Sequence, residues 1–284
     1  MATFTNRATL SYNGITTESN TVTGTFAETL AITKTSLTDT YGDGTRLTYV
    51  ISLINSGITA FTGLTLTDDL GAYQFNGNTL YPLTYVENSL LYYINGALQP
   101  TPTVADTQPL TVTGIAVPAG SNVTLVYSAD VNNTAPLDVG GEITNTASVT
   151  GGLQEPISAS ETVTAEEGAM LNITKALTPV SVPENGIITY TLTITNTGNT
   201  EAVATDNVIV SDTFDPILDL ISVTLNGAAL DEGTDYTYNE ATGQFDTAIG
   251  TITVPAATYT QNPDGTYTVT PGTATLAITG RIVA

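Results

Sequence analysis

Period-two alternation constrains the fold of this chain more than any other sequence feature. Thr48–Asn55 (TYVISLIN) and Thr189–Asn196 (TYTLTITN) have period-two alternation, with Tyr, Leu and Ile on one face and Thr or Ser on the other, where the first run also has Val50 and Ile54. Successive side chains of a β-strand point to opposite faces, so these runs predict strands with one apolar face. Asn-Gly, Asp-Gly, Pro-Gly and Gly-Gly pairs separate further short runs, and no window has a helical period. The sequence predicts an all-β fold of antiparallel β-sandwiches, with Tyr49 and Tyr190 as core or corner residues.

The alternating runs belong to two copies of one repeat. Leu30–Lys34 (LAITK) recurs as Leu171–Lys175 (LNITK), 141 residues later. Further matches follow in the same order: Thr48–Tyr49 with Thr189–Tyr190, Asn55–Gly57 with Asn196–Gly198, Leu66–Asp68 with Val210–Asp212, Ile94–Ala97 with Leu225–Ala228, and Gly120–Leu125 with Gly272–Leu276. Such long-period similarity indicates tandem domains, and 284 residues suffice for two cores. We predict a first sandwich at 28–167 and a second at 168–284.

The two copies differ in their last strands. The first copy continues through Ile143–Val149 and Ser160–Thr164, and we find no equivalent strands in the second copy. Their counterparts are Phe4–Leu10 and Ser19–Thr23, near the start of the chain. We therefore expect residues 1–27 to form an N-terminal extension of donor strands, and the second sandwich to be incomplete.

An incomplete sandwich exposes unpaired backbone groups and an open core unless another strand fills the gap. To fill it within one chain, the extension would have to pass the whole first domain. Donation to another subunit is simpler, and main-chain hydrogen bonds would give this contact its affinity. Because donor and acceptor lie at opposite ends, the contact predicts a head-to-tail homopolymer. The alternative is that residues 1–25 are a flexible leader and that the second domain uses fewer strands.

The ordered motifs resemble a known family. They are Leu30–Lys34, Thr48–Tyr49 with Asn55–Gly57, Thr67–Asp68 and Thr144–Ala147. This set resembles the tandem-repeat "domain of unknown function eleven" family of bacterial surface proteins, and the related pilin shaft domains that form Lys-Asn isopeptide bonds. The resemblance implies an immunoglobulin-like sandwich on the cell exterior. It also implies a bond from a first-strand Lys to a last-strand Asn, assisted by a buried acid.

The positions of the lysines support that chemistry independently. The chain has two lysines, Lys34 and Lys175, and both occupy the same repeat position. An amine must be neutral to attack an amide, and burial lowers the pKa of a Lys while raising that of a carboxyl group. A protonated Asp can then polarise the Asn carbonyl and relay the proton. We predict an internal bond between Lys34 and Asn145, assisted by Asp68.

In the second copy, Lys175 and Asp212 lack an Asn from their own domain, and the aligned residue is Asn6 of the neighbouring subunit. This alignment predicts a bond between subunits. Two simpler interpretations remain open. The lysines can cap strand ends or pair with Asp68 and Asp212, while Asn6 and Asn145 make turn hydrogen bonds. The alternative acids are Asp69, Asp215 and Glu28.

Composition excludes several classes of function. The chain has 5 basic and 27 acidic residues, and its net charge of −22 excludes electrostatic binding to nucleic acid or to an anionic membrane. The chain has no His and no Cys, which excludes Ser-His-Asp and Cys-His sites, His or Cys metal sites and disulfides. We therefore expect no enzyme and no cofactor. No run of about 18 apolar residues is present, so we expect no membrane insertion.

Two weaker signals remain. Four loop acids lie among Gly and Thr residues without the spacing of a calcium-binding loop, so we assign no metal site. These acids are Asp39, Asp43, Asp206 and Asp231. A glycosidase needs only two carboxylates, but the absence of Trp argues against a sugar-stacking platform.

The sequence analysis favours a structural protein. We expect the subunit of an extracellular bacterial filament, pilus-like or spore-appendage-like, on a cell or spore surface. The alternative is a surface adhesin or stalk module that acts as a monomeric binding segment. The sequence identifies no host or matrix ligand.

Overall fold

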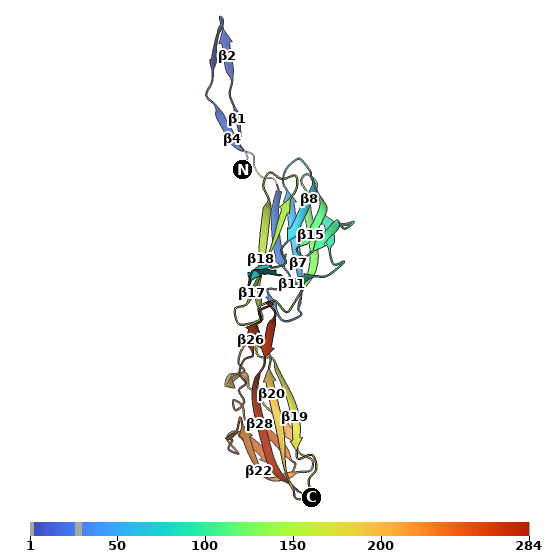
Figure 1. Ribbon diagram of the computed structural model, residues 1–284, viewed down its shortest axis with the longest axis vertical. Helices are drawn as coiled ribbons and strands as arrows, with labels where there is room; N and C mark the ends of the chain where they lie inside the picture. The colour runs from blue at the N-terminus through green and yellow to red at the C-terminus, as the bar shows by residue number, and fades with distance from the viewer. Residues whose placement is uncertain (1–2, 26–29, 284) are drawn as a thin grey trace. The chain divides into compact units, whose positions relative to one another are not determined.

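The computed structural model describes residues 3–25 and 30–283, which form β-strands along the whole length of the chain (Figure 1). Among these residues, the 3-10 turn η1 (Ala204–Asp206) is the one helical segment, and the strands of each sheet pair antiparallel. The prediction of an all-β fold is confirmed. The chain divides into two compact units. Unit 1 comprises Met1–Ala135 and Glu142–Thr164, and unit 2 comprises Pro136–Gly141 and Ala165–Ala284.

Unit 1 contains a sandwich of two sheets. The first sheet has the order β13 (Ala97–Gln99), β12 (Leu91–Ile94), β16 (Asn122–Val131), β7 (Arg46–Asn55) and β5 (Leu30–Ser36), and β11 (Leu83–Tyr85) also pairs with β16. The second has the order β14 (Thr103–Thr107), β15 (Leu110–Val117), β8 (Phe61–Asp68), β17 (Glu142–Thr150), β18 (Ile157–Ala165) and β6 (Thr40–Tyr41). A separate hairpin joins β9 (Tyr73–Phe75) to β10 (Asn78–Leu80). Alternate residues of β7, including Tyr49 and Ile51, are fully buried, as period-two alternation requires.

Unit 2 repeats part of this arrangement. Its larger sheet has the order β19 (Leu171–Thr178), β20 (Ile187–Asn196), β28 (Gly272–Ile282), β22 (Leu218–Leu225) and β23 (Ala228–Ala229). Its smaller sheet has the order β21 (Ser211–Thr213), β25 (Gln244–Thr247) and β24 (Tyr236–Asn239), and β26 (Thr258–Gln261) pairs with β27 (Tyr267–Thr270). Phe245, Leu276 and Ile278 are fully buried at the centre of the core. Matched Asn-Gly turns at Asn95–Gly96 and Asn226–Gly227 have positive φ at both residues, as two-residue hairpins require.

The N-terminal extension consists of two short strand pairs. β1 (Thr3–Asn6) pairs with β4 (Val22–Thr25), and β2 (Thr9–Tyr12) pairs with β3 (Ile15–Glu18). Within the described residues these four strands pair only with one another. The side chains of β1, β2 and β3 are exposed, so their apolar residues lie in solvent.

A buried Asn closes the same loop in both repeats. The amide of Asn55 donates to the carbonyl groups of Thr59 (2.8 Å) and Pro118 (3.0 Å), and its oxygen accepts from the Gly57 amide (2.9 Å). Asn196 makes the matching bonds with Thr200, Pro255 and Gly198. Each Asn side chain therefore supplies the hydrogen bonds that these backbone amide and carbonyl groups would otherwise need from water, because no neighbouring strand pairs with them.

We expect Asn55→Ala to destabilise unit 1 by about 2–3 kcal/mol, because the buried carbonyl groups lose their donor. Denaturant unfolding followed by circular dichroism measures this change. The matched control is Asn133→Ala, at an exposed position, which we expect to change the free energy of unfolding by less than about 0.5 kcal/mol. Equal effects of the two substitutions would contradict the capping role.

Candidate functional site

Three polar side chains meet inside the sandwich of unit 1. Lys34 comes from β5 in one sheet, and Asp68 and Asn145 come from the neighbouring strands β8 and β17 in the other. Each occupies an inward position of its alternating strand and is almost fully buried. The structure thus brings together the three residues that the sequence predicted for the internal bond. Because the set spans both sheets, a bond from Lys34 to Asn145 would tie the two layers together.

Lys34 and Asp68 form a buried ion pair. The Lys34 Nζ lies 2.6 Å from the Asp68 Oδ2, and both side chains are 0% exposed. The Asp68 Oδ1 accepts a hydrogen bond from the Leu70 amide at 3.2 Å. Burial lowers the pKa of Lys34 and raises the pKa of Asp68, while the attraction between the two charges opposes both shifts. Burial therefore favours moving the proton from the ammonium to the carboxylate.

Asn145 lies beside this pair, and only the nitrogen of its side-chain amide makes a hydrogen bond. Its Nδ2 donates to the Tyr127 hydroxyl at 2.9 Å, but its Oδ1 has no hydrogen-bond donor among the described residues. A buried carbonyl oxygen without a donor is energetically costly and uncommon in folded proteins. This oxygen can accept a proton from a neutral acid, which would make the amide carbon more electrophilic. Asn145 lies in the middle of β17, not in the turn that the simpler interpretation expected.

Tyrosine rings enclose the cluster. The Lys34 Nζ lies 4.9 Å from the centroid of the Tyr49 ring and 6.0 Å from that of Tyr127, and these two rings stack at 5.5 Å. Burial raises the pKa of both hydroxyl groups, so they remain protonated at neutral pH. The rings exclude water and strengthen the electrostatic interactions within the cluster. The sequence analysis missed Tyr127. The signal was its place in a second alternating run, but its pairing with Tyr49 depends on strand register.

The alternative acids lie in different surroundings. The Asp69 Oδ1 accepts hydrogen bonds from the amides of Gly71 (2.9 Å) and Thr146 (2.8 Å), so Asp69 organises the backbone beside the cluster. Asp215 is exposed in unit 2. Glu28 lies outside the described residues. Of the acids that the structure describes, Asp68 has the geometry to exchange a proton with Lys34.

The corresponding site in unit 2 contains the Lys and the Asp, but not the Asn, among the described residues. Lys175 on β19 forms an ion pair with Asp212 on β21, in agreement with the simpler interpretation of that pair. The Lys175 Nζ lies 4.3 Å from the Tyr190 ring centroid and 5.3 Å from that of Phe214. The Lys175 side chain is nevertheless 40% exposed, against 0% for Lys34. No Asn of unit 2 takes the place of Asn145 in the part of the chain that the structure describes, because β21 pairs with β25 alone.

The exposure of Lys175 belongs to a larger uncovered strip. In β5, Leu30 is 5% exposed, whereas its repeat counterpart Leu171 in β19 is 40% exposed. Ile173, the next inward position of β19, is 47% exposed. We call the inward face of β19, together with the outer edge of β21, the acceptor groove. In unit 1 the equivalent region is covered by β17 and β18, which continue the sheet beyond β8.

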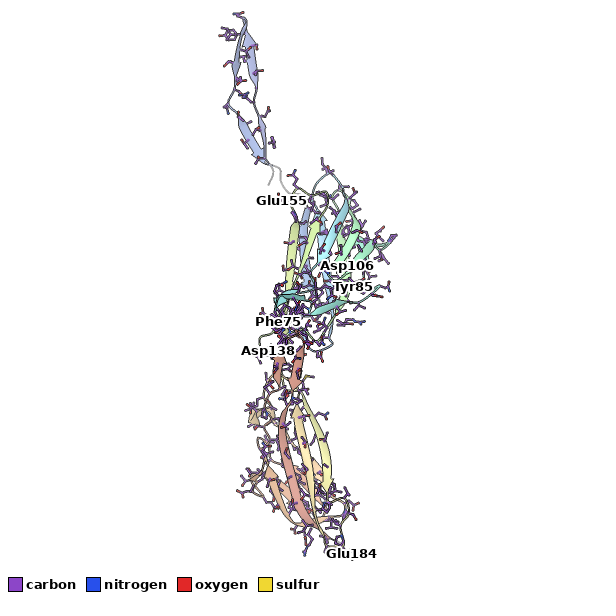
Figure 2. All side chains as sticks on the ribbon, viewed as in Figure 1. Phe75, Tyr85, Asp106, Asp138, Glu155 and Glu184 are labelled. Atoms are coloured by element: carbon purple, nitrogen blue, oxygen red, sulfur yellow. The ribbon has the colours of Figure 1, made fainter. Side chains whose placement is uncertain are left out.

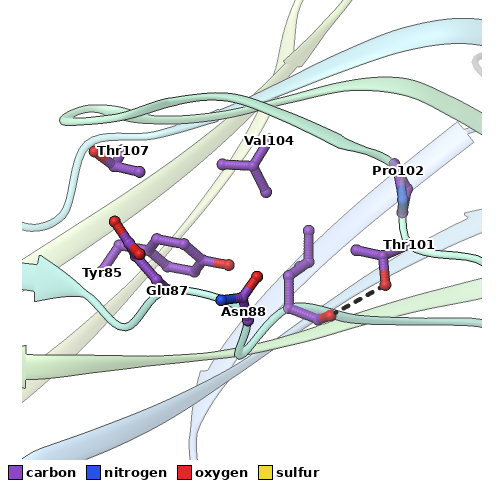
Figure 3. A pocket seen from close by; sticks show the side chains of 8 residues that line it. Tyr85, Glu87, Asn88, Thr101, Pro102, Val104 and Thr107 are labelled. Atoms are coloured by element: carbon purple, nitrogen blue, oxygen red, sulfur yellow. Dashed lines mark hydrogen bonds between the residues drawn. The ribbon is translucent and has the colours of Figure 1, made fainter.

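A separate pocket opens at the opposite edge of the unit 1 sandwich. It encloses about 500 Å³ and is lined by Tyr85, Glu87, Asn88, Leu90, Thr101, Pro102, Val104 and Thr107 (Figure 3). The Thr101 hydroxyl donates to the Leu90 carbonyl at 3.4 Å. The buried Tyr85 hydroxyl has no hydrogen-bond partner among the described residues, and its ring packs against Tyr127.

The remaining charged groups lie on the surface. Exposed acidic side chains include Asp106, Glu155 and Glu184 (Figure 2). No group of three His, Cys, Asp or Glu side chains is arranged to hold a metal ion, as far as the structure describes the chain. Within the same residues, no helix has the length and apolar character needed to cross a membrane.

Comparisons with known proteins give distant structural similarities. No family model and no curated protein matches this chain. BcpA, the major pilin subunit of Bacillus cereus, is 16% identical with a TM-score of 0.35, over 96% of this chain and 73% of that one. The pilus backbone protein RrgB of Streptococcus pneumoniae is 10% identical (TM-score 0.34; 89% and 49% covered). A collagen-binding domain of a Staphylococcus aureus adhesin is 15% identical (TM-score 0.31; 49% and 99% covered). At such values these similarities assign no function to this chain.

Proposed function

We propose that this protein is a structural subunit of an extracellular filament, pilus-like or spore-appendage-like, in which each subunit donates its N-terminal strands to unit 2 of the next. The observation that carries the proposal is the match between two uncovered surfaces. The acceptor groove exposes an apolar strip and a sheet edge, and the extension exposes the side chains that would cover them. A second copy of this chain is therefore the partner with the right chemistry.

The first strand pair of the extension has the register of the hairpin that fills the same place in unit 1, and the second pair, β2 with β3, is shifted from that register by one residue. Thr3 pairs with Thr25 as Glu142 pairs with Thr164. Thr3 precedes Glu142 in the sequence by as many positions as Thr25 precedes Thr164. Asn6 thereby corresponds to Asn145. The inward face of β17 carries Ile143, Asn145, Ala147 and Val149, all buried, and the extension carries Phe4, Asn6, Ala8 and Leu10, all exposed. The apolar-Asn-Ala-apolar pattern is the same in both segments.

Within unit 1 we propose a covalent bond between the Lys34 Nζ and the Asn145 Cγ. Lys34 passes a proton to Asp68 and attacks as a neutral amine, and Asp68 then protonates the Asn145 Nδ2 as it leaves. The Nζ loses its second proton to Asp68 as the new amide forms. One ammonia is released, and the net result is an amide between the two sheets. The buried pair, the unpaired Oδ1 and the tyrosine enclosure support this reaction. Such a bond suits a subunit that bears tension along a filament.

Deletion of residues 2–25 tests the proposal. We expect the full chain to form filaments visible by negative-stain electron microscopy and the deleted protein to remain monomeric, because the donor strands are gone. A synthetic peptide of residues 3–25 should raise the melting temperature of the deleted protein by occupying the acceptor groove. The control peptide has the same composition in scrambled order, which breaks the alternation of inward residues. Filaments from the deleted protein, or no shift with the native peptide, would overturn strand donation.

The pocket at Tyr85 favours a second candidate function, that of a surface adhesin. Its lining combines apolar side chains with several polar ones, as small-ligand sites do. The deletion separates the two functions. An adhesin module would keep both its monomeric state and its binding after loss of residues 2–25.

A further inference from the structure

We propose that the joint between subunits is a covalent site assembled only on docking, in which Lys175 and Asp212 of one subunit react with Asn6 of the next. This inference rests on the proposed strand donation and adds its register and its chemistry. Unit 2 holds the nucleophile and the acid in contact, and the extension holds an exposed Asn at the matching position. Neither half forms a complete site in an isolated subunit.

The register follows from unit 1. Ala147 pairs with Asp68 and Val149 with Leu66, where β17 lies against β8. Transferred to the joint, the same register pairs Ala8 with Asp212 and Leu10 with Val210. Asn6 then lies two residues before Ala8, on the same inward face, as Asn145 lies two residues before Ala147. A shift by one residue would turn Asn6 away from Lys175, so the register is part of the site.

Docking would change the surroundings of Lys175 from those of a surface amine to those of Lys34. The side chain is 40% exposed in the free subunit, and the uncovered residues Leu171 and Ile173 lie on the same face of the strand. Strand insertion covers this face and removes water from the ion pair. Exposed amines stay protonated and do not attack amides, whereas burial favours the neutral form. The reaction is thereby confined to assembled joints, which prevents a free subunit from reacting at random.

The covalent step balances without an external reagent. The Lys175 ammonium gives one proton to Asp212, and its neutral Nζ attacks the Asn6 Cγ. The bond between the Asn6 Cγ and Nδ2 breaks, and Asp212 returns the proton to the departing nitrogen. The second amine proton follows as the new amide forms, so one ammonium ion is released for each joint. No electron transfer occurs, and nothing other than the two side chains and the acid takes part.

The aromatic surroundings differ from those of unit 1 in one respect. Tyr49 pairs with Tyr127 across the sheet, whereas its counterpart Tyr190 pairs with Ile278. The joint therefore lacks a counterpart of the Tyr127 hydroxyl that holds the Asn145 amide. Phe214 provides the second ring instead, stacked on Tyr190 at 5.1 Å. We expect the joint to react more slowly than the site in unit 1, with docking as the first step.

Complementary variants of the full chain test the inference. Asn6→Ala removes the electrophile but keeps the acceptor groove, and Lys175→Met removes the nucleophile but keeps the extension. After boiling in detergent, the unmodified protein should give a ladder of multiples, and each variant alone should give monomer. A mixture of the two should give one covalent dimer and no larger species, because each dimer has no remaining reactive pair. Asn20→Ala, an exposed Asn on the same extension, is the matched control and should keep the ladder.

Electron microscopy of the same samples before boiling distinguishes a failure of the covalent bond from a failure of strand donation. Filaments that dissolve entirely to monomer on boiling would overturn the covalent joint and leave strand donation standing. Absence of filaments in the unmodified protein would overturn both. Peptide mapping of the dimer should find a branched peptide that joins Lys175 to Asn6 and is lighter by one ammonia. A link through another pair of residues would overturn the register.

Discussion

Asp68→Asn should prevent the bond in unit 1, so the variant should have the mass calculated from its sequence. The unmodified protein should be lighter than its own calculated mass by one ammonia, which the bond releases. The amide keeps the shape of the carboxyl group but can neither take the proton from Lys34 nor return it to the leaving nitrogen. Intact-mass spectrometry of the denatured monomer measures the difference. Asn145→Ala should give the same result by removing the electrophile, and it leaves the Lys34 and Asp68 pair untouched.

Loss of this bond should also lower thermal stability. The proposed bond would close a loop of about 110 residues, and by the chain-entropy relation used for cross-links it would contribute about 4–5 kcal/mol. For a unit of this size we expect the melting temperature to fall by about 10–20 °C. The matched control is Asp69→Asn, which keeps an oxygen for the Gly71 and Thr146 amides. It should retain the bond and the melting temperature, and loss of the bond in this variant alone would transfer the role of acid to Asp69.

The sequence predicted the strands well because alternation is a local property. Thr48–Asn55 and Thr189–Asn196 lie within β7 and β20, where alternate residues turn toward the core. The sequence repeat added information about residues that are far apart in the chain. Two copies with matching Lys and Asp positions imply matching places in the fold, and the structure brings Lys34 to Asp68 and Lys175 to Asp212.

Other features depend on register and packing, which the sequence does not encode locally. Tyr127 contacts Asn145 only because its strand pairs with Tyr49 in one particular register. The unpaired Oδ1 of Asn145 depends on the positions of all its neighbours. Leu171 lies in a motif similar to that of Leu30, so its exposure follows from the lack of a further strand beside β21 among the described residues and not from its own segment.

Leu10→Asp should abolish polymerisation, whereas the same charge change at the adjacent Thr9 should be tolerated. In the proposed register, Leu10 takes the place of Val149, which is fully buried, and Thr9 takes the outward place of Ser148. A carboxylate at the inward position would be buried at the joint without a partner. This costs about 3 kcal/mol or more, which corresponds to an affinity at least about 100-fold lower for the joint.

Both side chains are exposed in the free subunit, Leu10 by 61%, so neither substitution should change the stability of the monomer. This makes the pair a test of docking alone. Sedimentation velocity over a range of protein concentrations gives the affinity of the joint, with the melting temperature as the check on folding. Equal loss of polymer in Leu10→Asp and Thr9→Asp would show that charge on the extension, and not its inward face, controls assembly. Loss in Thr9→Asp alone would place the opposite face of the strand against the groove, which would also turn Asn6 away from Lys175.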